Sequence, residues 1–367
     1  MMNKEKKIYF SNGVIIGQNC WCCAEDGQEI CKTNIITGMT TIVKCLDERI
    51  SGYSFYNSVI YNEERLYFIP LLSDVLLVYD INKNNVEEYE IDSNICRGKG
   101  AKFISAGIYK DNMYMFPCCA DHVCRFNVIS KEIEYLQNIT NMQAKNSSTG
   151  LTYCFGTGVK CDEIFWLPVL GRDMIVAYSM FTNEYREYVI DSKEEGFRYL
   201  VKIDDDFYLL TRNGNVVHWN LERGFCKKYD NPNATEKVAL GRNIYSKIVY
   251  FENAIWLFPA FGVNIVRLDL MSGERIEYSD YKDGLQESDA ISEIGIFGEG
   301  MQNGEEVIMF PHTLNGLVRI NLRSTEITTS RLVHNIGETV LSLGKEEDLI
   351  ENKENVGKEI FKYIGKC

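Results

Sequence analysis

The chain alternates short apolar blocks with polar turns, and one arrangement of the two recurs along most of its length. In FPCCADHVCRFNV, residues 116–128, an apolar block ends at a proline, a short loop follows, and a second block ends in aromatic–Asn–apolar. This arrangement of two apolar blocks around a short loop occurs, with variations, seven times along the chain. The residue that ends the first block of each copy is a reference position, and these positions lie 43 to 52 residues apart: Cys23, Pro70, Pro117, Pro168, Thr211, Pro259 and Pro311.

The apolar blocks predict buried strands that stop at the reference position. The chain holds six prolines, and five of them occupy this position. Proline has no N–H to give to a strand ladder, so it belongs where a strand stops. An uninterrupted apolar run is typical of a strand covered on both faces. The first copy is weaker, and the other six runs are 66–69, 113–116, 164–167, 207–210, 255–258 and 307–310.

Three further strands complete each copy. A third strand ends in apolar–[Asp, Asn or Ser]–apolar, and short polar side chains of this kind bond downstream N–H groups and set up a turn. A more polar, alternating segment follows as an outer edge strand, and a first strand precedes the apolar block. Four strands in each repeat of ~40–50 residues predict an all-β, seven-bladed β-propeller. The expected blades are about 8–45, 54–92, 103–138, 153–191, 197–230, 244–279 and 292–332.

The repeat length and strand rhythm resemble those of kelch-type propellers over residues 8–335. The double glycine that kelch repeats carry after the second strand is replaced by Pro-Cys-Cys, Pro-Val-Leu or Pro-His-Thr. The resemblance therefore implies a propeller fold, and it transfers no family's binding residues to this chain. How the ring closes is left open, because the last copy already supplies four strands and residues 7–10 could add another.

The C-terminal stretch breaks the repeat. Residues 344–367 place apolar side chains at 349, 350, 356, 360, 361 and 364, with charged residues between them. This spacing predicts a short amphipathic helix over 345–365, in an extension that begins at residue 336. Such a helix caps a face of its own domain or docks a partner. We expect capping, because surface helices usually pack on their own domain.

Charge and cysteine content narrow the classes of function. The chain has 39 Lys and Arg residues against 52 Asp and Glu, a formal net charge of −13. Phosphate binding needs a basic footprint, so we expect no nucleic-acid partner. Neither a leader peptide nor an apolar run of membrane-spanning length is visible, and we expect no membrane span. The 13 cysteines are then expected to be reduced thiols in the cytoplasm. The oligomeric state is left open.

A candidate ligand site follows from the strand order. Loops after the second strands and links between blades emerge on one face, around the mouth of the central channel. We expect a small polar or sugar-like ligand, or a protein partner, to bind there. The opposing interpretation is that loop tips are polar everywhere. The candidate residues on these loops are Asp74, Asp121, His122, Arg172, Asp173, Arg212, Asn264 and His312.

Candidate catalytic and metal chemistry is sparse. Cys118, Cys119, His122 and Cys124 invite a zinc site, but adjacent strand residues point to opposite faces and the spacing is not that of a zinc knuckle. No metal, cofactor or catalytic residue is therefore expected, and the favoured function is non-enzymatic recognition. The rival is an enzyme acting on a small polar or carbohydrate-derived substrate through mouth groups, since propellers host both functions. Its groups would be His122, Asp173, Arg212 and His312.

Overall fold

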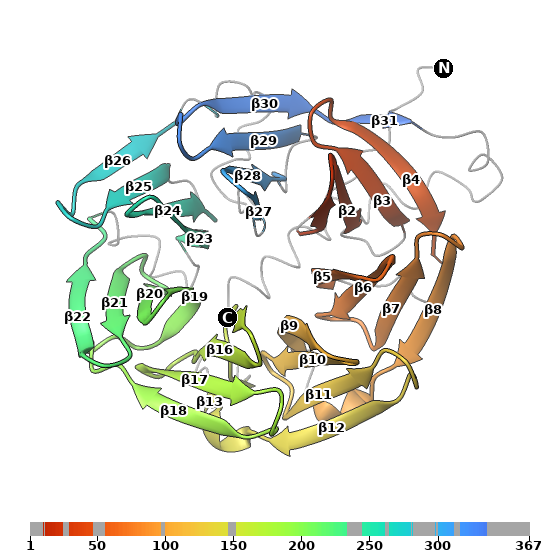
Figure 1. Ribbon diagram of the computed structural model, residues 1–367, viewed down its shortest axis with the longest axis horizontal. Helices are drawn as coiled ribbons and strands as arrows, with labels where there is room; N and C mark the ends of the chain where they lie inside the picture. Colours follow the sequence, from red (N-terminus) through yellow and green to blue (C-terminus); the bar gives the residue numbers. More distant parts are fainter. Residues whose placement is uncertain are drawn as a thin grey trace.

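The fold is a ring of seven β-sheets around a central axis (Figure 1). The computed structural model describes residues 10, 12–24, 29–46, 56–96, 100–145, 152–232, 244–260, 264–279, 281, 298, 300–311 and 316–335. The expected all-β class and the seven four-stranded antiparallel blades are confirmed. The helix expected over 345–365 lies outside the described residues, as does His312.

Each blade is built from one unbroken stretch of chain that runs outward from the axis. The first three blades are β1 (Val14–Ile16), β2 (Asn19–Cys23), β3 (Glu29–Asn34) and β4 (Met39–Cys45); β5 (Tyr56–Asn62), β6 (Arg65–Pro70), β7 (Val75–Asp80) and β8 (Asn85–Glu90); β9 (Phe103–Tyr109), β10 (Asn112–Pro117), β11 (His122–Asn127) and β12 (Ile133–Asn138).

The next four blades have the same order. They are β15 (Val159–Cys161), β16 (Ile164–Pro168), β17 (Met174–Ser179) and β18 (Tyr185–Val189); β19 (Phe197–Ile203), β20 (Asp206–Thr211), β21 (Val216–Asn220) and β22 (Gly224–Tyr229); β23 (Tyr245–Phe251), β24 (Ala254–Pro259), β25 (Ile265–Asp269) and β26 (Arg275–Tyr278); β27 (Met301–Asn303), β28 (Glu306–Met309), β29 (Gly316–Asn321) and β30 (Ile327–Arg331). The links between blades hold η1 (Ser93–Ile95), η2 (Thr140–Met142) and the hairpin of β13 (Ala144–Lys145) and β14 (Thr152–Tyr153).

Strands stop and turns form at the positions that the sequence predicts. In six blades the reference residue is the last residue of the second strand, whereas β28 ends at Met309, two residues before Pro311. The polar residue that ends the third strand also acts as expected. The Asn127 Oδ1 atom accepts hydrogen bonds from the N–H groups of Ile129 (2.9 Å) and Ser130 (2.8 Å). The equivalent atoms of Asn34, Asn220, Asp269 and Asn321 make the same pair of bonds.

The hydrophobic core is divided among the seven wedges between consecutive blades. Each wedge contains its own cluster of buried apolar side chains. Phe116 of β10 and Phe165 of β16, for example, have ring centroids 4.3 Å apart across the wedge between the third and fourth blades. The wedge that joins the seventh blade to the first is filled partly by sulfur: Cys20 Sγ lies 3.3 Å from Met301 Sδ.

Close backbone contacts join the inner strands near the axis. The N–H of Gly158 donates to Ser105 Oγ (2.9 Å), and the N–H of Thr157 donates to the carbonyl of Arg198 (2.8 Å). A Cβ atom on Gly156 would lie 2.1 Å from that carbonyl oxygen, so the approach requires glycine. These contacts tie together the third, fourth and fifth blades where their inner strands begin.

The ring closes through a fifth strand on the first blade. β31 (Val333–Asn335) pairs in parallel with β4, with Val333 opposite Met39, and the N–H of Val333 donates to the Gly38 carbonyl (3.0 Å). Figure 1 shows β31 beside β4 at the rim, directly after β30. The first and seventh blades keep their own four strands, so closure adds a strand to the outer edge of the first blade and exchanges none within it.

Candidate functional site

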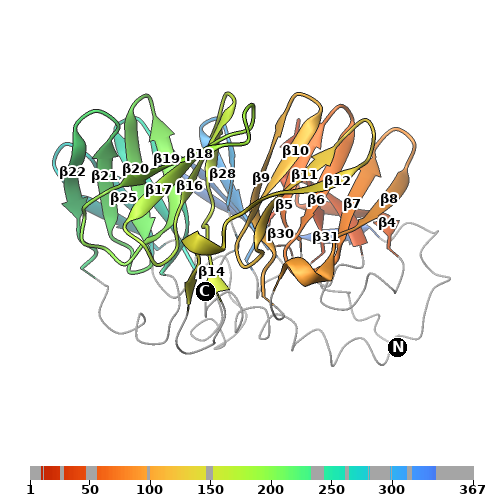
Figure 2. The same cartoon turned by 90° about the horizontal axis from the view of Figure 1, so that it is seen from below.

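The predicted site residues that the structure describes lie on the face where the inner strands begin, here called the mouth face. On this face lie the described connections from second to third strands, the short helices η1 and η2 and the β13–β14 hairpin, on the lower side in Figure 2. The tight turns between first and second strands and between third and fourth strands lie on the opposite side, here called the turn face.

An aromatic residue and a β-bulge mark the entry of the inner strand in four blades. Tyr56, Phe103, Phe197 and Tyr245 are buried, and each pairs with the reference residue of its own blade. One extra residue follows each of them, which shifts the register. Bulges re-aim side chains at the ends of strands. The recurring aromatic was visible in the sequence, but only the paired strands show the extra residue as a bulge.

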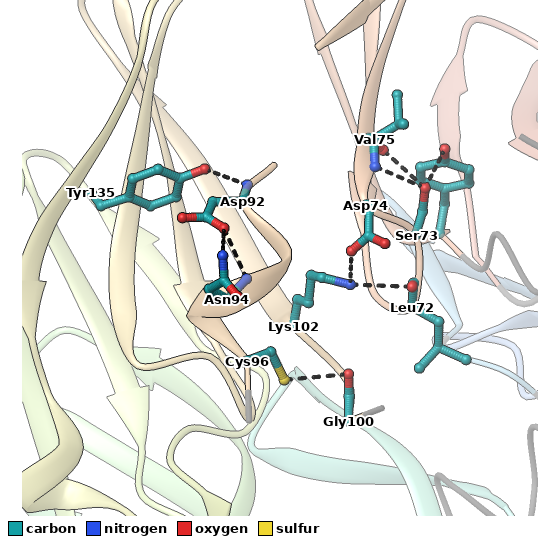
Figure 3. A network of polar contacts seen from close by, with 11 residues as sticks. Leu72, Ser73, Asp74, Val75, Asp92, Asn94, Cys96, Gly100, Lys102 and Tyr135 are labelled. Carbon is teal, nitrogen blue, oxygen red and sulfur yellow. Dashed lines mark hydrogen bonds and ion pairs between the residues drawn. The ribbon is translucent and has the colours of Figure 1, made fainter. Parts of the chain in front are cut away.

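Lys102 and Asp74 form an ion pair on this face, and its ammonium group is buried (Figure 3). Lys102 directly precedes β9, and its side chain is only 8% exposed. Its Nζ atom lies 2.7 Å from Asp74 Oδ1 and donates to the Leu72 carbonyl (3.3 Å). A buried ammonium group needs such partners, because its desolvation is costly. The Asp74 side chain is nevertheless 60% exposed. Its carboxylate is therefore held in place by Lys102 and still open to solvent.

Ser73 completes this arrangement on the other side of Asp74 (Figure 3). Its hydroxyl lies 3.1 Å from the Tyr56 hydroxyl and accepts a hydrogen bond from the N–H of Val75 (3.0 Å). Burial raises the pKa of Tyr56 far above its usual value, so this phenol stays neutral. The loop that carries Asp74 is therefore held from both the second blade and the link into the third.

Three of the predicted acidic residues occupy one repeated position, immediately before the third strand. Asp74, Asp121 and Asp173 each use the backbone carbonyl to accept the N–H of the isoleucine that directly follows the fourth strand, at 2.7, 3.0 and 3.0 Å. Asn215 and Asn264 hold the same position in the fifth and sixth blades. The sequence signal was an Asp or Asn directly before the third strand in six of the seven copies, with Gln28 in the first.

The side chains at this position also hold the link to the next blade. Asp121 Oδ1 accepts from Gln143 Nε2 (3.1 Å). The Asp173 carboxylate accepts from the Ser192 hydroxyl (2.6 Å) and the N–H of Lys193 (2.8 Å). The Asn215 amide oxygen accepts the N–H of Asn231 (2.8 Å). These side chains therefore have a structural role, because each connects its blade to the following link. Asp74 differs from Asp121 because its carboxylate is largely exposed.

The remaining predicted residues are spread over several blades. Arg172 is exposed, and its guanidinium donates to the Asn141 carbonyl (2.6 Å), which fixes it over the link between the third and fourth blades. Asn264 donates to Glu277 (2.7 Å) within its own blade. Arg212 directly follows β20 and is partly buried. His122 opens β11 opposite Asn138, and its Nδ1 atom is buried without a hydrogen-bond partner among the described residues.

Thiols near the mouth belong to an apolar cluster. Cys96, Cys118 and Cys119 pack with Leu71, Tyr153 and Leu170. Burial raises the pKa of Cys96 and of Cys154, so both stay protonated at neutral pH. Within the part of the chain that the structure describes, no group of three or more His, Cys, Asp or Glu residues could hold a metal ion. The thiols in FPCCADHVC thus pack as apolar side chains.

Comparison with known proteins supports the propeller fold but identifies neither a family nor a function. Neither a family model nor a curated relative matches the chain. The computationally designed Ika8 protein is similar in structure, with a TM-score of 0.53, 10% identity, and coverage of 89% of this chain and 98% of the other. At such low identity the likeness shows the fold alone.

Two bacterial proteins give the same result. One is the extracellular domain of a putative hybrid two-component system from B. thetaiotaomicron (TM-score 0.56, 10% identity), and the other is PorZ of Porphyromonas gingivalis (0.55, 11%). Both comparisons cover 89% of this chain, but only 39% and 38% of those longer chains. Separately, no helix in the described residues has the length and apolar content needed to cross a bilayer.

Proposed function

We propose that this chain is a non-enzymatic recognition propeller whose mouth face binds a protein partner or a small polar, sugar-like ligand. The observation that carries the proposal is the Asp74 carboxylate, which a buried ammonium group holds in place while its side chain stays 60% exposed. Fixed charged groups bind with little loss of side-chain entropy, which is what a recognition surface needs. Arg172 supports the proposal, because its exposed guanidinium is held by the Asn141 carbonyl.

The other elements of the proposal rest on less specific support. The kelch-type repeat length favours a binding scaffold, because propellers present loops on a rigid ring. The described cysteines are free thiols, which favours a reducing compartment such as the cytoplasm. The enzymatic rival, with His122, Asp173, Arg212 and His312 at the mouth, stays a prediction.

Ligand-dependent stabilisation tests the proposal directly. A panel of neutral sugars, sugar acids and amino sugars should contain a compound that raises the melting temperature of the protein, because a ligand of the native state stabilises it by mass action. Asp74→Asn and Arg172→Gln should abolish that shift, whereas Glu88→Gln on the outer strand β8 should keep it.

A protein partner would be identified by cross-linking in a cell extract, with the same three variants. The partner should be captured by the parent protein and by Glu88→Gln, and lost with Asp74→Asn. A ligand or partner retained at full affinity by both Asp74→Asn and Arg172→Gln would place recognition elsewhere on the molecule and refute the proposal.

A further inference from the structure

The turn face carries a repeated feature that recognition at the mouth does not explain. The side chain that ends each third strand accepts N–H groups of the following turn, and the second residue after it stands at the tip of that turn. In the seven blades this tip residue is Ile36, Asn82, Ile129, Phe181, Glu222, Met271 and Arg323. Since an amide, a carboxylate or a guanidinium fills the position in three blades, the backbone does not require an apolar residue there.

The apolar tips are nevertheless well exposed. Ile129 is 67% and Phe181 is 65% exposed, and Ile36 and Met271 are exposed as well. Large apolar side chains gathered on a surface are typical of interaction sites. Two of the tips belong to consecutive blades, the third and the fourth. Lys110, in the turn between the first and second strands of the third blade, lies 5.2 Å from the Tyr109 ring and 5.1 Å from the Phe181 ring, which places that turn beside the Phe181 turn of the fourth blade.

Carboxylates lie closer to the axis on the same face. The turn between first and second strands contains Asp111 in the third blade and Asp162 with Glu163 in the fourth, all exposed. The same turn is acidic in the other blades from the second to the seventh: Glu63, Glu64, Asp204, Asp205, Glu252 and Glu305. Only the first blade lacks an acidic residue there, with Gly17 and Gln18.

Several of these turns keep a charged residue where glycine would be more stable. Glu63, Asp162, Asp204 and Glu252 have φ values of 49°, 53°, 51° and 45°, and Lys110 fills this position in the third blade with a φ of 53°, whereas the first and seventh blades place Gly17 and Gly304 in this conformation. A non-glycine residue in the left-handed region costs about 1 kcal/mol. The chain therefore maintains charge on this face at a cost in stability.

We propose that the turn face over the third and fourth blades docks a protein segment in which basic side chains flank apolar ones. Ile129 and Phe181 would contact the apolar side chains of that segment, while Asp111, Asp162 and Glu163 would face its basic groups. Complementary charge steers association and excludes acidic partners. An anionic membrane surface is disfavoured, because the same carboxylates would repel it.

Binding of two designed peptides tests the proposal on the full chain. The probes are a leucine–lysine amphipathic peptide and a leucine–glutamate peptide of the same length, measured by fluorescence anisotropy. The parent protein should bind the first and not the second, with an affinity that falls as salt rises. Ile129→Ser with Phe181→Ser should weaken binding about tenfold, and so should Asp111→Asn with Asp162→Asn and Glu163→Gln.

Two controls assign the site to this face. Glu88→Gln with Glu90→Gln removes acidic charge from the outer strand β8, and Asp74→Asn removes it from the mouth face; both should bind the peptide as the parent does. Failure of the parent protein to bind, equal losses in the β8 control, or undiminished binding by the Ile129 and Phe181 variant would each overturn the proposal. So would capture of the parent protein by anionic phosphatidylserine vesicles in place of the peptide. The mouth-face proposal is tested separately, by the loss of ligand or partner binding in Asp74→Asn.

Discussion

At the scale of single residues, the most demanding positions are those where two backbones meet near the axis. The Arg198 carbonyl receives the N–H of Thr157 and leaves no space for a side chain on Gly156. Gly107 meets the Phe165 ring in a similar way, because a Cβ atom on this glycine would lie 2.8 Å from that ring. Side chains at these two points would separate neighbouring blades that other contacts hold together.

A methyl group at Gly156 should therefore be costly. We expect Gly156→Ala to lower the free energy of unfolding by about 3 kcal/mol, because overpacking against backbone leaves no flexible neighbour to move. Gly17→Ala is the matched control: it has a φ of 60° and no atom within 4 Å of the added carbon, so only about 1 kcal/mol of backbone strain is expected. Urea denaturation measures both, and equal losses would contradict the packing argument.

Asp206 gives a prediction on pH. Burial alone would raise the pKa of this carboxyl, but hydrogen bonds from His218 Nε2 (2.8 Å) and Asn220 Nδ2 (2.8 Å) outweigh burial and hold the pKa below its usual value. A group whose pKa is lower in the folded state stabilises the fold above the unfolded-state pKa, and loses that contribution as pH falls through the folded-state value.

The parent protein should therefore be more stable than Asp206→Asn at neutral pH. This advantage should shrink below the pKa of an unfolded aspartate, about 3.9. Urea unfolding of both proteins across an acidic pH series measures the difference. A difference that stays constant or grows below that pKa would show that Asp206 is not held as a carboxylate by these partners.

At the scale of elements, the sequence reveals the blades well and the polar loops poorly. Proline at the strand end and Asn or Asp in the turn act locally, so their roles can be predicted from neighbouring residues alone. The roles of Asp121 and Asp173 could not, because their partners Gln143 and Ser192 lie on the link to the next blade. Nor could β31 be predicted, since three residues pair with a strand almost three hundred positions away.

The pairing of β31 with β4 can be weakened without changing a residue in any of the seven four-stranded blades. Val333→Pro removes the N–H that bonds to the Gly38 carbonyl, and should cost about 1–2 kcal/mol. Val333→Thr keeps the N–H and the branched side chain, and should be close to neutral. Limited proteolysis followed by mass spectrometry should find faster cleavage after residue 331 in the proline variant only; equal cleavage in both would mean that β31 contributes little to closure.

At the scale of the whole molecule, stability is shared among seven wedges, and one of them differs in kind. Six wedges join blades that are also linked by the chain, whereas the wedge between the seventh and first blades joins the two ends of the ring. It contains Cys20, Cys22 and Cys31, while Cys124 lies in the wedge between the second and third blades. Sub-global opening should begin at this wedge, because only non-covalent contacts, among them the pairing of β31 with β4, hold the two ring ends together.

Thiol labelling detects this opening. In increasing urea, pulsed alkylation should modify Cys20, Cys22 and Cys31 before Cys124, because separating the ring ends breaks fewer interactions than unfolding an internal wedge. Mass spectrometry of the peptides gives the order. Simultaneous modification of all four thiols at the global transition would show that the ring opens only as it unfolds.

The origin of every blade in one unbroken stretch of chain also sets the order of events during synthesis. A blade can complete its own hydrogen bonds as soon as its four strands have left the ribosome, because all its pairings are local. The first blade, however, waits with one wedge face bare until the seventh has emerged. Its cysteine-rich face is therefore the apolar surface that stays uncovered longest, and β31 is the last of the described strands to reach its partner.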